Sequence, residues 1–220
     1  MRSVVLVTVL ASFAGTQVPL SAQSADMSRF HRASVRALNR ENASDVLNRA
    51  MKGKKPEEAR AAGRELAARG VARLKSEDLK RRAELMLDFT SQAGTRVCSA
   101  WSRGTVTPDQ TANMVAKLDS AAFDDWVALS VRSMVAEARD KPKAFKGSDK
   151  DMTKMFEALA TAMTADENQR FHDVMSRFDK ASNEDACWFG QQLYRSALAL
   201  DGKKREHALR TLAWIEIQPS

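Results

Sequence analysis

The feature that most constrains the fold of this chain is a series of apolar and small residues that recur at helical spacing. In the middle of the sequence, seven such residues follow one another at steps of three or four: Leu79, Ala83, Met86, Thr90, Ala93, Val97 and Trp101. Residues at these steps share one face of a helix, so they can face a common core. The series predicts a single helix that Ser76 caps and that ends at Gly104.

The same spacing recurs along most of the chain, and the composition agrees with it. Only 9 of the 220 residues are Gly and 5 are Pro, which argues against an all-β sandwich or barrel. We therefore predict an all-α fold, a compact bundle of about nine or ten helices. Ser148, Thr164 and Ser182 are expected to cap three of them, the last two with an acidic residue three positions later.

The first 22 residues have the order of a secretory signal peptide. Arg2 is followed by an uncharged run of 11 residues from Val4 to Ala14 and then by small residues that lead to a cut after Ala22. A membrane-spanning helix needs about 20 apolar residues, so this run is too short to be one. We predict export, to a bacterial periplasm first and to the outside of the cell second. The remaining residues, 23–220, are expected to form one helical domain, with an alternative boundary at 141–147.

The only two cysteines are Cys98 and Cys187. In an oxidising compartment, two thiols in one chain usually form a disulfide, and we predict this bond. A catalytic thiol would need a His or Lys nearby and often a CxxC motif, and the sequence has neither beside these residues.

Two glycines suggest how the helices that carry the cysteines cross. Gly94 comes four residues before Cys98, and Gly190 comes three residues after Cys187, so each glycine shares a helix face with its cysteine. If the helices are antiparallel, the two glycines face each other and allow a close approach, flanked by Trp101 and Trp188. The alternative is that Gly94 only interrupts its helix.

The positive charge is concentrated in the first part of the mature chain. The net charge is +7, and residues 23–82 hold 16 Lys and Arg against 8 Asp and Glu. Because the chain is expected to be exported, nucleic acid is not an expected partner. The basic residues 23–82 could meet an anionic envelope surface or an acidic protein. The alternative is a set of solvated helix faces with ordinary ion pairs, such as Glu65 with Arg69.

The sequence predicts no catalytic residue, metal site or cofactor. The three histidines, His31, His172 and His207, belong to no HExxH or Cys/His pattern. His172, Asp173 and Glu167 are the best candidates for an acid–base site, and positions on a helix surface explain them more simply. An uncharacterised envelope enzyme therefore stays an alternative only.

Several methionines and phenylalanines lie at helical spacing in the second half of the chain. They could form a flexible apolar face that binds varied partners, or they could fill a core. The residues of this predicted face are Met152, Met155, Phe156, Met163, Phe171 and Met175.

Two short segments resemble a known signature. The run VTPDQ, from Val106 to Gln110, is similar to the LTxxQ signature of small periplasmic stress chaperones. The run MTAD from Met163 also resembles it, although Glu167 stands where Gln is expected. The resemblance covers only these segments, both of which a capping box explains, and we do not assign the chain to that family.

These observations lead to one expected function and two alternatives. We expect an exported, non-catalytic helical protein that binds another envelope or secreted protein. The first alternative is a periplasmic chaperone-like protein that holds unfolded clients on the Met/Phe face, and the second is the envelope enzyme.

Overall fold

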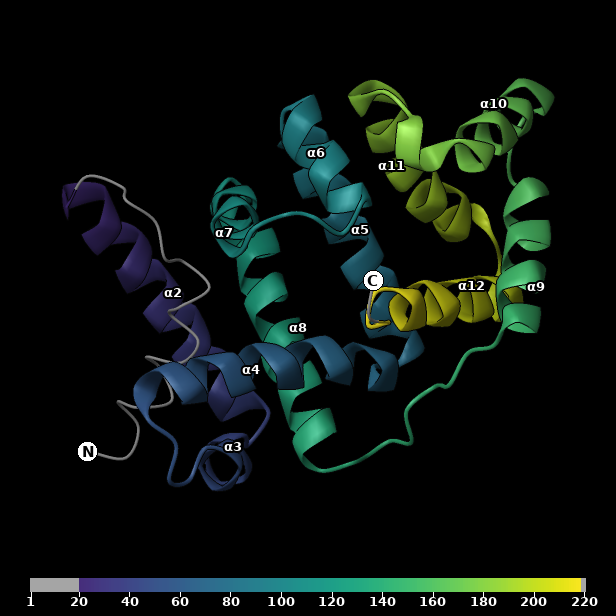
Figure 1. Ribbon diagram of the computed structural model, residues 1–220. Helices are drawn as coiled ribbons and strands as arrows, with labels where there is room; N and C mark the ends of the chain where they lie inside the picture. Colours follow the sequence, from purple (N-terminus) through teal and green to yellow (C-terminus); the bar gives the residue numbers. More distant parts are fainter. Residues whose placement is uncertain (1–19, 219–220) are drawn as a thin grey trace. The chain divides into compact units, whose positions relative to one another are not determined.

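The computed structural model describes residues 20–218, with side chains from Arg29 onward (Figure 1). Residues 1–19 of the predicted signal peptide lie outside the described residues, so that peptide stays a prediction. The described part contains eleven α-helices, labelled α2 to α12, two short 3-10 helices and no strand. The all-α prediction is confirmed, with slightly more helices than expected. Within residues 20–218, no helix combines the length and the apolar character needed to cross a membrane.

The chain divides into two compact units. Unit 1 consists of the residues up to Leu74 together with Pro108–Ala144, and unit 2 consists of Lys75–Thr107 together with Phe145–Ser220. The division after Ala144 falls inside the predicted alternative boundary at 141–147. The single domain over residues 23–220 stays a prediction.

Unit 1 is built around helix α8 (Ser120–Ala138), which packs against all four other α-helices of the unit. These are α2 (Leu20–Arg40), α3 (Ser44–Ala50), α4 (Pro56–Gly70) and α7 (Pro108–Ala116), and the 3-10 helix η2 (Val71–Arg73) follows α4. The apolar face of α8 is buried, with Val127, Val131 and Met134 at its centre.

Helix α4 approaches α8 closely because the α4 residues that face it are small. Ala59, Gly63 and Gly70 are buried along this side. A Cβ atom on Gly70 would lie 1.9 Å from the carbonyl oxygen of Ser133, so only glycine fits there. This contact explains why α4 has so few large apolar residues.

Unit 2 is built around α11 (Asn183–Ala199), which packs against all its other α-helices. These are α5 (Ser76–Gln92), α6 (Thr95–Ser102), α9 (Asp149–Ala160), α10 (Ala165–Ser176) and α12 (Gly202–Ile215), with the 3-10 helix η3 (Phe178–Lys180) before α11. The three predicted caps are confirmed, because the side chains of Ser148, Thr164 and Ser182 each accept a hydrogen bond from the backbone three residues later.

The single helix predicted from Ser76 to Gly104 is wrong. Ser76 is the first residue of α5 and not its cap, because Lys75 holds the N-cap position and makes no side-chain cap hydrogen bond. Helix α5 ends at Gln92, the backbone is extended at Ala93 and Gly94, with ψ of 133° and 151°, and α6 begins at Thr95. Glycine loses more conformational freedom than other residues in a helix, so a break at Gly94 costs little. The apolar spacing continues across the break because both helices face the core of unit 2.

Candidate functional site

The predicted disulfide is confirmed and joins α6 to α11. The Cα atoms of Cys98 and Cys187 are 5.1 Å apart, and Cys98 is completely buried. The amide of Gln191 donates a hydrogen bond to the sulfur of Cys98, with 3.7 Å between the nitrogen and the sulfur. Both cysteines serve as a covalent link, and no free cysteine is found in the described part of the chain.

The predicted contact of Gly94 with Gly190 is wrong. A Cβ atom on Gly190 would lie 2.1 Å from the hydroxyl of Ser102, whereas one on Gly94 would meet nothing within 4 Å. Cys98 on α6 meets Cys187 on α11, and Ser102, four residues later on α6, meets Gly190, three residues later on α11. The two helices therefore run in the same direction at this crossing. An antiparallel crossing would require opposite directions. Gly94 therefore only separates α5 from α6, which was the alternative.

The two tryptophans expected beside this crossing have different surroundings. Trp101 lies at the crossing, with its ring centroid 5.5 Å from that of Tyr194. Trp188 packs against the core cluster that contains Phe171 and Phe189, and the guanidinium of Arg170 lies 4.2 Å over the ring of Trp188. Only Trp101 covers the place where α11 comes closest to α6.

The six residues of the predicted Met/Phe face pack within unit 2. Phe171 stacks on Phe189 with centroids 4.6 Å apart, and Phe156, Met163 and Met175 are half-buried around this pair. Met155 is fully buried and Met152 is half-buried in the same helix, α9. These contacts favour core packing, the alternative, over an open binding face.

The candidate acid–base residues occupy separate surface positions on α10. Glu167 accepts hydrogen bonds from the backbone N–H and the hydroxyl of Thr164, and these bonds lower the pKa of its carboxyl group. Asp173 accepts a hydrogen bond from Gln169, while His172 is exposed and touches Phe171 edge-on. Glu167 is thus a helix cap, and the three side chains do not converge on one point.

The other two histidines lie far apart in the sequence and belong to different units. His31 is exposed on α2, whereas the Nε2 of His207 lies 3.9 Å from a carboxylate oxygen of Asp151. No group of three or more His, Cys, Asp or Glu side chains that could hold a metal ion occurs within the described residues.

Sequence reasoning missed a partly buried polar group in unit 2. Arg82 on α5 pairs with Glu216, at 2.5 Å between Nη2 and the carboxylate, and the hydroxyl of Tyr194 also donates to Glu216. Burial, together with the nearby carboxylate, raises the pKa of Tyr194 well above its usual value. Burial opposes the charge of Arg82, but Glu216 offsets this and keeps the pKa of Arg82 high. The group ties the end of α12 to α5 and α11.

A second missed group lies in unit 1, where Arg73 is almost fully buried. Its Nε donates to Glu137 at 2.6 Å, one terminal nitrogen donates to Asp140 at 2.5 Å, and the other donates to the carbonyl oxygen of Pro142 at 2.8 Å. The bond to Glu137 raises the pKa of Arg73 even though burial acts against it. Arg69 contacts the other oxygen of Glu137 at 2.7 Å.

Many basic residues of the predicted basic segment 23–82 are engaged in such contacts. Arg29, for example, donates to the carbonyl oxygens of Leu118 and Asp119, and Arg36 pairs with Asp124 at 2.7 Å. The positive charge that can meet a partner is therefore smaller than the sequence count suggests, and it depends on the cations that lack an internal pair.

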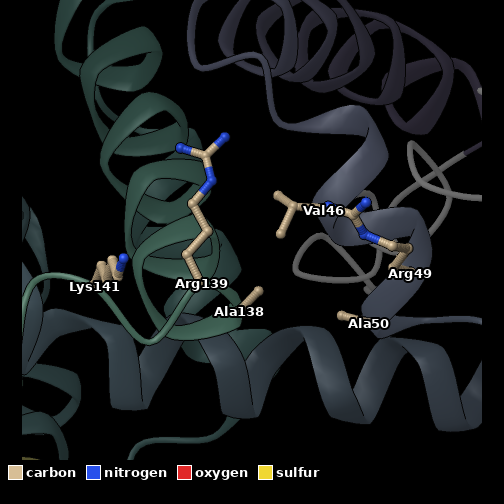
Figure 2. A pocket seen from close by; sticks show the side chains of 6 residues that line it. All are labelled: Val46, Arg49, Ala50, Ala138, Arg139 and Lys141. Carbon is tan, nitrogen blue, oxygen red and sulfur yellow. The ribbon is translucent and has the colours of Figure 1, made fainter.

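Three cations line a recess in unit 1, between α3 and the end of α8 (Figure 2). The recess has a volume of about 570 Å³, and its lining residues are Val46, Arg49, Ala50, Ala138, Arg139 and Lys141. None of these lining residues is acidic. We name this pocket the basic recess and take it as the candidate site.

A second recess, of about 530 Å³, lies in unit 2 where α9 ends and α12 begins. Its lining includes Lys203 and Lys204 but also the carboxylate of Asp201, so its charge is mixed.

Comparison with known proteins identifies no relative of this chain. No protein-family model matches it, and neither a search of curated proteins nor a search of solved structures finds a match. The basic recess and the disulfide must therefore be interpreted from their own chemistry.

Proposed function

We propose that this chain is an exported, non-catalytic helical protein that binds another envelope or secreted protein through the basic surface of unit 1. The observation that carries the proposal is the disulfide between Cys98 and Cys187, because structural disulfides form and persist mainly outside the cytosol. Exposed cations of unit 1, such as Arg32 and Arg64, favour a partner with an acidic surface.

The arrangement of the side chains supports binding over catalysis. Glu167 caps a helix, Arg73 and Arg82 hold packed helices together, and both cysteines are joined. A chaperone that uses the Met/Phe face is less well supported, because Met155 and Phe171 are buried within unit 2.

The test combines localisation with capture. The full chain, expressed in a bacterial host, should be found in the periplasmic fraction with no thiol that reacts under denaturing, non-reducing conditions. The oxidised protein should capture one stoichiometric partner from envelope extract. A cytoplasmic, fully reduced protein would contradict the proposal of export.

A matched pair of variants tests the binding surface. The double variant Arg32→Glu, Arg64→Glu reverses two exposed charges of unit 1, and Lys146→Glu, Lys180→Glu reverses two in unit 2. The first variant should lose the partner and the second should keep it. Equal retention by both would exclude the basic surface of unit 1, and capture of many unfolded chains would favour the chaperone.

A further inference from the structure

We propose that the basic recess binds the phosphate group of an organic phosphomonoester. This inference goes beyond the proposed function, because it requires neither export nor a protein partner. The ester could be a free metabolite or the headgroup of a lipid, and the chemistry recognised is the same in both cases.

The first argument is that the cations of the recess lack carboxylate partners. Within the described residues, the side chains of Arg49 and Lys141 make no ion pair, and the side chain of Arg139 makes only a long hydrogen bond, 3.4 Å, to the carbonyl oxygen of Asn42. Other arginines of the same unit, such as Arg36 and Arg73, contact carboxylates directly. The recess is therefore a place where unit 1 leaves positive charge uncompensated.

The second argument is that the acidic residues nearest in sequence to Arg139 and Lys141 are occupied elsewhere. Asp140 has a φ of 53°, in the left-handed region, and its carboxylate pairs with Arg73. Arg139 and Lys141, on either side of it, both line the recess. Glu137 is bound by Arg69 and Arg73. At the end of α8, the acidic side chains therefore contact Arg69 and Arg73, whereas Arg139 and Lys141 line the recess.

The third argument weighs the charges. The recess lies beside the last turns of α3 and α8, and a helix C-terminus carries at most roughly half a negative charge. Two such ends cannot neutralise three cations, which leaves a net charge of about +2. A phosphomonoester at neutral pH carries nearly two negative charges and three terminal oxygens, whereas a carboxylate carries one charge and two oxygens.

The shape of the recess favours an ester over inorganic phosphate. Its volume of about 570 Å³ is within the range of small-molecule sites. Arg49 comes from α3 on one side, and Arg139 and Lys141 come from the segment that follows α8 on the other, while Val46, Ala50 and Ala138 supply apolar surface (Figure 2). Guanidinium groups bind phosphate oxygens in pairs, and the apolar side chains leave space for the organic group.

Calorimetry with phenyl phosphate at moderate ionic strength tests the site. We expect binding, with at least a tenfold loss of affinity in Arg139→Gln and in Arg49→Gln. Arg139→Lys should lose affinity as well, because it keeps the charge but removes the paired hydrogen bonds. The matched control is Arg96→Gln, an exposed arginine of unit 2 outside the recess, and it should change the affinity less than twofold.

The two sources of the ester are separated with vesicles. Phosphatidylcholine vesicles with phosphatidic acid offer a lipid phosphomonoester, and vesicles with phosphatidylglycerol offer a diester. Binding to phosphatidic acid that is lost in Arg139→Gln would identify a lipid headgroup, and binding of phenyl phosphate alone would identify a soluble ester. No binding of either monoester, or an equal loss in Arg96→Gln, would overturn the proposal. Circular dichroism of each variant shows that it is folded.

Discussion

The two units use different means to hold helices of similar length together. In unit 1, α8 is held by the small residues of α4 and by arginine–carboxylate contacts such as Arg73 with Glu137. In unit 2, α11 is held by the disulfide and by packed aromatic rings, of which Phe171 and Phe189 are the closest pair. Helical periodicity alone therefore does not indicate which interactions fix the packing of helices.

The two units also differ in the residues that they contain. Unit 1 contains the basic recess, whereas unit 2 contains three of the four tryptophans and the only tyrosine, Tyr194. We expect unit 1 to be more sensitive to salt and to substitution of charged residues, and unit 2 to be more sensitive to reduction.

The largest effect should follow from removal of the disulfide. The double variant Cys98→Ser, Cys187→Ser should lose about 3 kcal/mol of unfolding free energy, because a link across 89 residues restricts the unfolded chain. Urea denaturation measures the loss. Hydrogen exchange should show a greater loss of protection in α6 and α11 than in α8, since both cysteines lie in unit 2. Equal losses in both units would end the contrast between them.

A somewhat smaller effect is expected from Glu137→Ala. The side chains of Arg73 and Glu137 are 10% and 8% exposed, so the variant leaves a buried guanidinium without its main partner. The expected cost is about 3 kcal/mol or slightly less, because Asp140 still pairs with Arg73. Glu65→Ala is the control, since Glu65 is 65% exposed, and it should cost less than about 1 kcal/mol. Similar urea midpoints for both variants would show that the buried pair contributes no more to stability than the exposed pair does.

Ionisation of Tyr194 should destabilise unit 2 at alkaline pH. The pKa of Tyr194 is raised in the folded protein, so the folded state favours the neutral phenol. Stability is therefore complete below the usual tyrosine pKa of about 10 and decreases as the pH rises from there toward the folded pKa. Because the chain has one tyrosine, tyrosinate absorbance follows this group alone.

Tyr194→Phe supplies the control for the alkaline experiment. This variant should lose about 1 kcal/mol near neutral pH, since a hydrogen bond to Glu216 disappears, and it should lack the additional alkaline loss. A tyrosine that titrates at its usual pKa in the folded protein would contradict the buried placement.

The smallest expected effect comes from Thr164→Ala, which removes the capping box of α10. The loss should be about 1 kcal/mol, measured by thermal or urea unfolding. The hydrogen bonds from Thr164 lower the pKa of Glu167, so their stabilisation is present above the usual pKa and is lost as the pH falls through the folded one. In the variant, NMR titration should show a higher pKa for Glu167.

Thr153→Ala is the matched control on α9. Thr153 is exposed and its hydroxyl bonds only the carbonyl of Asp149 within the same helix, so its removal should change stability by less than about 0.5 kcal/mol. A loss as large as that of Thr164→Ala would show that the capping contact contributes nothing specific.

Local features of the sequence were predicted well because they depend on neighbours in the chain. The caps Ser148, Thr164 and Ser182 act within one turn, so their chemistry can be read from residues three positions apart. The break at Gly94 was harder to predict, because the apolar spacing runs through it and only the packing of α6 on α11 shows that two helices share one pattern.

The candidate site could not be predicted from spacing. Arg49 and Arg139 are 90 positions apart in the sequence, and nothing near either residue indicates that they line the same recess. Spacing did identify the Met/Phe residues, but it did not indicate whether they are buried, since helical spacing is the same for a buried stripe and for an exposed one.

The sequence by itself determined the helical class, the caps and the two thiols that could pair, because these depend on composition and on contacts within a few residues. Tertiary structure decided which side of each helix is buried, where α11 meets Ser102 instead of Gly94, and which cations keep a carboxylate partner. The physical reason is that burial and ion pairing depend on residues distant in the chain, which come together only when the helices pack.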